Sequence, residues 1–268
     1  MARTEGRMAN LLLRWVSPLS GLRRVPILGG FLSWTSHQLV PHDTLIWIQI
    51  QQGPAQGLWI RVNPRTGQNF QQGTGEPAVQ DAIQKHVRPG MTFYDLGANI
   101  GFFSLMAARL VGSGGCVISF EADPEIAARL RENLAYNKLT HAAAEERAVW
   151  FEHTTVSFAR VDSRTSPDRG LGHVSTEVSA ATKTICVEAV SLDEFVLLHP
   201  SPDFVKCDVE GAEVAVFQGA ERLLREKCPI LLVEIHSPEN YRVLTQNFRQ
   251  FGYACTDLDQ NHVLALPR

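Results

Sequence analysis

Residues 91–111 read MTFYDLGANIGFFSLMAARLV, which predicts a buried strand, a glycine-containing turn and a helix. The strand covers 91–96, and the helix covers 101–111, where apolar residues recur three and four positions apart. The turn between them contains Asp95, Gly97, Asn99 and Gly101, and its glycines let a ligand approach the backbone and the helix N-terminus. Units of this kind build the parallel sheets of α/β proteins.

The alternation of strands and helices continues along the chain. Further strands are predicted at 116–121, in a segment that ends near Val149, at 202–210 and at 229–236; helices are predicted at 124–137, 212–225 and 238–251. The segments YACTDL and HVLALP flank Asp259-Gln260-Asn261 and predict a closing hairpin. We therefore expect an α/β fold with a mostly parallel sheet and an antiparallel hairpin at its C-terminal end.

The region before residue 91 divides into two parts. Residues 1–43 form a leader, and within 1–24 five arginines alternate with apolar side chains. We interpret this leader as a loosely packed extension, with an amphipathic segment that lies on a membrane or a partner as the alternative. Residues 44–90 predict a hairpin with strands at 44–50 and 57–62 and a helix from Pro77 to His86, packed on the main domain of residues 91–268.

The composition argues against several classes of protein. The 268 residues include 25 basic and 28 acidic side chains, and a net charge of −3 argues against a nucleic-acid partner. No apolar run reaches the roughly 18 residues that cross a bilayer. Five cysteines without a CxxC pair argue against a disulfide framework and a structural zinc site. We expect a cytoplasmic protein, peripheral to a membrane if residues 1–24 bind one.

Acidic residues lie where the first two predicted strands end. Glu121 follows the second strand about 20 residues after the glycine turn, where an acid can accept hydrogen bonds from a ribose diol. Asp95 would repel phosphate groups at the turn, so this turn differs from the GxGxxG pattern that binds dinucleotides. A carboxylate there favours a positively charged ligand such as S-adenosylmethionine (SAM), which has an ammonium, a sulfonium and no phosphate.

More charged residues end the two later strands. Strand alternation places Lys206, Asp208 and Glu210 on one side of the first of them, and Glu234 and His236 on one side of the second. Charged side chains within apolar parallel strands are costly unless they serve a site or pair with one another. A buried ion pair of Lys206 with Asp208 or Glu234 is the alternative for part of this group.

These segments resemble the FkbM-type SAM-dependent methyltransferases. The resemblance rests on DLGANIGFFSL, SFEADPE, VKCDVEGAEVAVFQGAERLL and LLVEIH, and it is clear over 92–137 and 190–236. It implies a Rossmann-like class I methyltransferase fold with a seven-stranded sheet. It also implies an enzyme that O-methylates a hydroxyl of a sugar, a glycolipid or another natural product, with SAM as its cofactor and a small-molecule or glycan acceptor as its partner.

The resemblance also implies roles for particular residues. The methionine part of SAM would be surrounded by Asp95, Gly97, Asn99 and Gly101, the ribose would be held by Glu121, and the adenine would lie near Ala148 and Val149. Asp208, which we also expect near the cofactor, and Glu210 would face the methyl-transfer site. Glu76 matches a family acid only loosely, because Pro77 departs from the pattern.

Methyl transfer to an alcohol is assisted by a base that takes the hydroxyl proton. We expect His236 or Asp208 to be this base, with Lys206 and Glu234 setting its charge state. A divalent metal held by Asp208, Glu234 and His236 is the alternative, which we rank below a metal-free reaction. The other histidines, His262 among them, are interpreted as surface or structural, and the polar stretch 159–184 around His173 as an acceptor lid or a disordered loop.

Two other functions are considered. The first is a non-catalytic SAM-fold module that binds a glycan or a partner, and the intact residues Asp95, Gly97, Gly101 and Glu121 argue against it. The second is a methyltransferase that acts on RNA or protein. DVEG after the fourth strand, where a base N-methyltransferase has NPPY or DPPY, argues against methylation of a base nitrogen. Five lysines and the lack of a basic stripe beyond the leader argue against an RNA substrate.

Overall fold

The computed structural model of this chain describes residues 44–64, 67–160, 173–174 and 183–268. The predicted leader 1–43 lies outside the described residues, as does most of the stretch 159–184.

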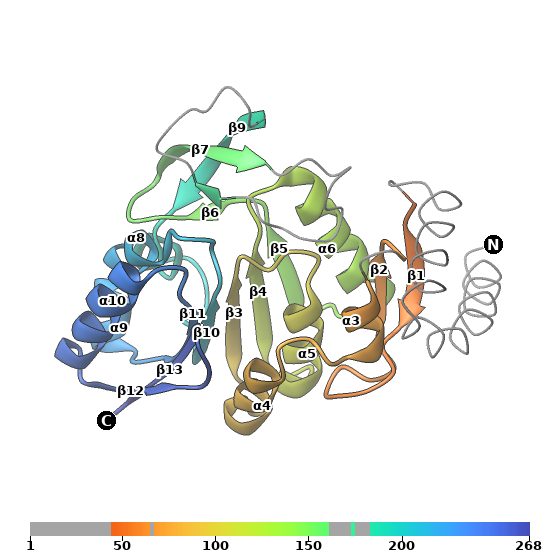
Figure 1. Cartoon of the computed structure of the whole chain (residues 1–268), viewed down its shortest axis with the longest axis horizontal. Helices are drawn as coiled ribbons and strands as arrows, with labels where there is room; N and C mark the ends of the chain where they lie inside the picture. Colours follow the sequence, from red (N-terminus) through yellow and green to blue (C-terminus); the bar gives the residue numbers. More distant parts are fainter. Residues whose placement is uncertain (1–43, 65–66, 161–172, 175–182) are drawn as a thin grey trace, which may run out of the picture.

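A seven-stranded sheet forms the centre of the molecule (Figure 1). Its strand order is β12-β13-β11-β10-β3-β4-β5, and β13 runs antiparallel to both of its neighbours while β11, β10, β3, β4 and β5 are parallel. The bounds in this order are Tyr253–Asp257, His262–Pro267, Ile230–Glu234, Phe204–Cys207, Thr92–Leu96, Cys116–Phe120 and Ala142–Glu145. The predicted α/β fold with a C-terminal antiparallel hairpin is confirmed.

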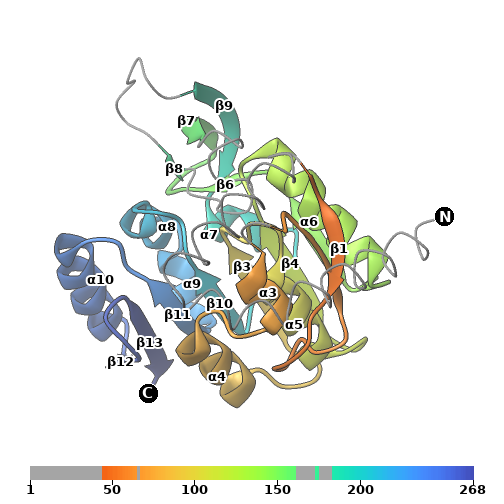
Figure 2. The same cartoon turned by 45° about the vertical axis from the view of Figure 1, so that its right-hand side comes forward.

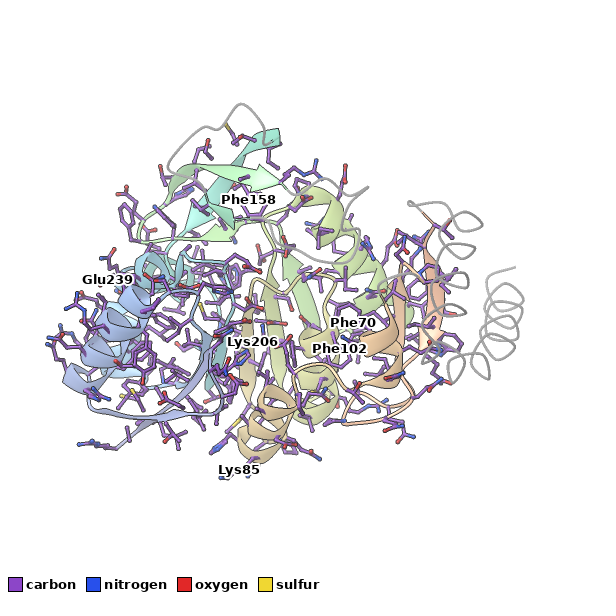
Figure 3. The ribbon with its side chains drawn as sticks, in the orientation of Figure 1. Phe70, Lys85, Phe102, Phe158, Lys206 and Glu239 are labelled. Carbon is purple, nitrogen blue, oxygen red and sulfur yellow. The ribbon has the colours of Figure 1, made fainter. Side chains whose placement is uncertain are left out.

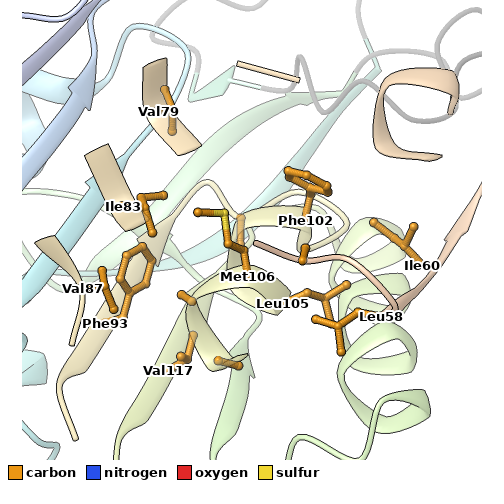
Figure 4. Packing of buried hydrophobic residues seen from close by; sticks show 14 of the residues in the cluster. Leu58, Ile60, Val79, Ile83, Val87, Phe93, Phe102, Leu105, Met106 and Val117 are labelled. Atoms are coloured by element: carbon orange, nitrogen blue, oxygen red, sulfur yellow. The ribbon is translucent and has the colours of Figure 1, made fainter. Parts of the chain in front are cut away.

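Helices cover both faces of this sheet. Successive strand residues point to opposite faces, so Phe93 joins a cluster with residues of α4, α5 and α6, while Tyr94 joins a cluster with residues of α7, α8, α9 and α10. Figure 4 shows the first cluster, where Phe93 lies near Ile83 of α4. The helices α4 to α10 span, in this order, Pro77–His86, Phe102–Val111, Pro124–Tyr136, Leu192–Phe195, Glu213–Gln218, Glu221–Glu226 and Pro238–Gln250.

Local sequence explains where the long helices begin. Pro124 and Pro238 occupy the first helical turn, where a missing N–H costs nothing. The preceding residues Asp123 and Ser237 accept hydrogen bonds from N–H groups of that turn, at 2.9 Å from Glu125 and 3.1 Å from Asn240. Among the described residues, no helix combines the length and the hydropathy that a membrane span requires.

The hairpin that precedes the main domain packs on α6 (Figure 2). Its strands are β1 (Ile46–Gln49) and β2 (Trp59–Val62), and the short helix α3 (Gln68–Gln72), which the sequence pattern did not predict, follows it. The amide side chains of Asn133 and Asn137 accept hydrogen bonds from the backbone N–H groups of Arg61 and Trp59, both at 2.8 Å. α6 therefore serves as the partner for the outer edge of β2.

A second, four-stranded sheet lies above the carboxyl ends of the central strands (Figure 1). Its order is β6-β9-β7-β8, and its strands span Ala148–Val149, Lys183–Val190, Thr154–Arg160 and His173–Val174. One prediction is wrong here, because the strand predicted to end near Val149 is split between the two sheets. The stretch 159–184 lies mostly outside the described residues, and its described parts are β8 and the ends of β7 and β9.

The prediction of one helix over 212–225 is also wrong, because this segment forms two helices. α8 ends at Gln218 and α9 begins at Glu221, and the chain bends at Gly219. A side chain at Gly219 would overlap the backbone of Trp150 and Phe151, so this bend lets the connection after β6 pass close to the helix. The predicted strands 202–210 and 229–236 also end early, at Cys207 and Glu234, which places Asp208, Glu210 and His236 in the loops that follow.

Candidate active site

A cavity of about 390 Å³ lies at the carboxyl ends of the parallel strands, where ligands bind in open α/β sheets. Its lining follows the order of the central strands, from Glu121 after β4 through Gly97 after β3 and Asp208 after β10 to Glu234 of β11. Strands lie about 4.8 Å apart, so the cavity extends about 14 Å from the end of β4 to the end of β11.

The second sheet lines the other side of this cavity. Phe158 of β7 and Val174 of β8 line it together with Ala148 and Val149 of β6, so this end is largely apolar. Figure 3 shows Phe158 in the second sheet, above the strand that carries Lys206. The sheet is joined to the main domain by Arg160, whose Nε donates to Asp123 Oδ2 at 2.6 Å. Of this wall, Ala148 and Val149 were expected near the adenine, whereas Phe158 was not singled out and Val174 fell in the predicted polar loop.

The glycine turn approaches its neighbours closely. Gly97, Asn99 and Gly101 all have positive φ angles, of 75°, 51° and 89°, and the N–H groups of Gly97 and Ala98 both donate to the carbonyl of Phe120. A Cβ atom at Gly97 would overlap the carbonyl oxygen of Asp208. The turn after β3 and the segment after β10 are therefore held in direct backbone contact.

Glu121 is the acid at the cofactor end that the sequence predicts. Its two carboxylate oxygens accept hydrogen bonds from the N–H groups of Asn99 and Asp123, both at 2.9 Å. Burial raises the pKa of Glu121 to about 7. Each oxygen can accept one further hydrogen bond, and Glu121 lines the cavity, so its carboxylate suits a diol.

Asp95 lies beneath the cavity and does not line it. The residue is 0 % exposed, its Oδ2 accepts from Ser104 Oγ at 2.6 Å, and its pKa is raised by burial. Lys206 is its cross-strand partner, with Nζ 4.0 Å from Oδ1. Asp95, which we expected beside the methionine part of SAM, is therefore not among the residues that line the cavity. Gly101 does not line the cavity either, because it packs against Leu130.

Lys206 links the buried Asp95 to Asp208 at the cavity. Its Nζ donates to Asp208 Oδ2 at 3.2 Å, and Asp208 lines the cavity. Burial lowers the pKa of Lys206, but the carboxylates of Asp208 and Asp95 outweigh this effect and raise it above its ordinary value. Lys206 is thus a fixed positive charge that holds Asp208 in place, as the ion-pair interpretation predicted.

His236 is surrounded by carboxylates. Its Nδ1 donates to Glu213 Oε1 at 2.7 Å, and its Nε2 lies 3.3 Å from Glu210 Oε2 and 3.9 Å from Asp208 Oδ1. The hydrogen bond to Glu213 raises the pKa of His236 to about 9, although burial by itself lowers this pKa. The ring therefore carries its proton at neutral pH and is a donor in this arrangement, which disfavours the predicted role of His236 as base. Burial and the charge of Asp208 raise the pKa of Glu210.

His262, which we interpreted as surface or structural, is buried beside the cavity and contacts residues that line it. It lies directly opposite Glu234 in the pairing of β11 with β13, and it is 7 % exposed. Its Nε2 lies 3.4 Å from Glu234 Oε2 and 3.6 Å from Glu76 Oε2. Burial lowers the pKa of His262, but Glu234, Glu76 and Asp259 outweigh it and raise the pKa to about 10. The strand register that creates this contact cannot be read from one sequence.

Two groups of side chains bring ligand atoms close enough to share a metal ion. One is the predicted set of Asp208, Glu234 and His236, and the other is Glu76, Glu234 and His262. In each group the candidate ligand atoms lie within 4.8 Å of one another. Glu234 belongs to both groups, so the two sites lie side by side at the end of β11.

Comparisons with known proteins agree with this architecture. The family model of the methyltransferase FkbM domain matches residues 95–256, from the glycine turn to the C-terminal hairpin. The chain is similar to the crystal structure of a methyltransferase FkbM from Methylobacillus flagellatus KT, with 16% identity and a TM-score of 0.50. That match covers 81% of this chain and 48% of the other, so this chain spans about half the length of the solved protein.

A curated relative is similar over a shorter stretch. An arsenite methyltransferase from Halobacterium salinarum is 40% identical over 65 residues, which are 24% of this chain and 16% of that protein. The family match and the structural likeness confirm the predicted class I fold and the predicted SAM-dependent methyltransferase domain.

We expect Gly97→Ala to destabilise the chain strongly. The new Cβ would overlap the Asp208 carbonyl, whereas Gly90→Ala has a similar φ of 87° and nothing within 4 Å, so the pair isolates the overlap from the cost of positive φ. Gly97→Ala should lower the free energy of unfolding in urea by about 1 to 3 kcal/mol more than Gly90→Ala does. Equal losses in the two variants would contradict the close approach.

Proposed function

The chain belongs to the FkbM methyltransferase family, and we propose that it transfers the methyl group of SAM to a hydroxyl of a sugar, a glycolipid or another glycosylated metabolite. One observation carries this proposal. A single cavity joins an apolar end that contains one diol-binding acid to an end that contains several carboxylates. The first end suits a nucleoside, and the second suits an acceptor with several hydroxyl groups.

The cofactor end fits SAM in shape and in chemistry. Glu121 presents its carboxylate for the ribose hydroxyls, and the apolar side chains of Ala148, Val149 and Phe158 offer surfaces for adenine. Gly97 and Asn99 expose backbone toward the methionine part. Asp95 acts through its neighbours, because it holds Ser104 and balances the charge of Lys206 below the turn.

The acceptor end is rich in negative charge. Asp208, Glu210 and Glu234 all line the cavity there, and carboxylates accept hydrogen bonds from the hydroxyl groups of a sugar. The same charges attract a sulfonium cation. With few basic residues in this lining, the arrangement favours a neutral polyol over the phosphate backbone of a nucleic acid.

Asp208 is the proposed general base. SAM supplies an activated methyl group, and the acceptor oxygen forms its bond to that methyl carbon while the carbon–sulfur bond breaks. The hydroxyl proton passes to Asp208, which lines the cavity and is held by Lys206. His236, which keeps its proton, orients Glu213 and Glu210 around this point. Positioning and exclusion of water are the main demands of such a displacement.

The acceptor class can be tested directly. Purified full-length protein would be incubated with SAM that carries an isotopic label on its methyl group, together with neutral sugars, glycolipids, total RNA or a protein extract. Label recovered in a base-stable methyl ether on a sugar or glycolipid is the expected result. Label found only in RNA or protein, or no transfer from a protein that binds SAM, would overturn the proposed acceptor.

The ribose contact predicts a pH-dependent affinity for 5′-methylthioadenosine, which has no group that titrates between pH 6 and 8. Ribose hydroxyls donate to the ionised form of Glu121, whose pKa is about 7 without ligand. Affinity should therefore rise about tenfold from pH 6 to pH 8, as the protein loses that proton before binding. Calorimetry of Glu121→Gln should show an affinity about 10- to 100-fold weaker at pH 8 and nearly constant with pH. A wild-type affinity that falls with rising pH would contradict this role.

The assignment of the base predicts unequal effects of two substitutions. Asp208→Asn should lower kcat by about 100- to 10,000-fold, because the amide cannot accept the proton. His236→Gln, which still fills the space beside Glu213, should lower kcat less, by about tenfold at most. Steady-state kinetics with a saturating acceptor would measure both, and binding of 5′-methylthioadenosine would control for the cofactor end. The reverse order of the two effects would make His236 the base.

A further inference from the structure

Three side chains from separate parts of the chain meet at the acceptor end of the cavity. Glu76 directly precedes α4, Glu234 ends β11, and His262 begins β13. β11 and β13 pair so that Glu234 and His262 stand opposite each other, and the left-handed backbone at Glu76, with φ of 47°, begins the helix beside them. Their candidate ligand atoms lie within 4.8 Å of one another.

The Nε2 atom of His262 indicates that this group can hold an ion. It is buried and has no hydrogen-bond partner, although the imidazole faces two carboxylates. Its distances of 3.4 Å to Glu234 and 3.6 Å to Glu76 exceed the usual range for a hydrogen bond. Two atoms that each bind a common ion at about 2.1 Å are about 3.0 to 3.4 Å apart, so this spacing is closer to that of ligands around an ion.

Asp259 fixes the orientation of the imidazole. Its carboxylate accepts from His262 Nδ1 at 2.8 Å and from the backbone N–H groups of Asn261 and His262 at 3.0 and 2.9 Å. With Nδ1 held in this way, Nε2 must point toward Glu76 and Glu234. A carboxylate that holds one nitrogen of a histidine while the other binds a metal is a recurrent arrangement in metalloproteins.

We propose that Glu76, Glu234 and His262 bind one divalent metal ion and that Asp259 orients the histidine. The ion would take the place of the proton that Nε2 carries in the metal-free chain, and that proton would be released, because histidine binds a metal as the neutral imidazole. Two carboxylates and one imidazole suit a first-row cation such as Mn²⁺, and three protein ligands leave positions for water or a ligand oxygen. Glu76 and Glu234 line the cavity, so the ion would lie beside the acceptor. The consequence that it binds an acceptor oxygen rests on the proposed function.

The neighbouring group with His236 is less suited to the ion. Nδ1 of His236 donates to the buried Glu213, and its Nε2 lies nearest to Glu210, which is not one of the three candidate ligands. The side chain of His236 is also 24 % exposed, compared with 9 % for His262. His236 therefore provides a matched control, since it is a second histidine that faces the same Glu234 from another direction.

Titration of the full-length, chelator-treated protein with MnCl₂ tests the site, with the electron paramagnetic resonance signal of free Mn²⁺ as the readout. The wild type should bind one ion per chain. Glu76→Gln and His262→Gln should weaken binding by at least about 100-fold and Asp259→Asn by about 10- to 100-fold, while His236→Gln should retain it. No binding by folded wild type, or loss in His236→Gln with retention in His262→Gln, would overturn the proposal.

Two controls keep the result interpretable. Circular dichroism and thermal unfolding would establish that each variant is folded. If His262→Gln is unfolded, wild-type affinity in both Glu76→Gln and Asp259→Asn would still refute the site. Calorimetry with 5′-methylthioadenosine on the same samples tests the proposed cofactor end separately from the metal site. Nucleoside binding without Mn²⁺ binding refutes the metal site alone, and Mn²⁺ binding without nucleoside binding refutes the proposed cofactor end alone.

Discussion

The backbone contact between Gly97 and Asp208 is the constraint on which the site depends. Because no side chain intervenes, the turn after β3 lies directly against the segment after β10, and the N–H of Asp208 donates to the carbonyl of Leu96 at 3.0 Å. One of these segments lines the cofactor end and the other carries the proposed base. Their relative position is therefore set by main-chain packing, which is stiffer than any contact between flexible side chains could be.

Buried charge follows from the position of the site in a sheet that is covered on both faces. A row of polar side chains crosses three neighbouring strands at Ser119, Asp95 and Lys206, on the face covered by α5. Lys206 balances Asp95 below and Asp208 beside the cavity, while His236 balances Glu213 and Glu210. Glu121 is held instead by the backbone N–H groups of Asn99 and Asp123, so the donors and acceptors are ordered before a ligand binds.

The sequence predicted the features that local patterns determine. The glycine turn, the positions of Glu121 and Asp208 at strand ends and the closing hairpin could all be read from short segments. What it missed depends on tertiary contacts. Gly219 interrupts a helical pattern because Trp150 and Phe151 pass against it, and His262 reaches Glu234 through a strand register. The strands β7 (TTVSFAR) and β9 (KTICVEAV) were not predicted, and only their ends at 159–160 and 183–184 fall in the predicted polar loop.

The amide pair on α6 has a consequence for how the chain behaves at high concentration. A two-stranded hairpin has open edges, and unpaired N–H and C=O groups on such an edge invite strands of other molecules. Asn137 accepts from the N–H of Trp59 and donates to its carbonyl, and Asn133 accepts from the N–H of Arg61, so α6 imitates a neighbouring strand along β2. Two asparagines one helical turn apart thereby protect this edge from intermolecular β-pairing and from the aggregation that follows it.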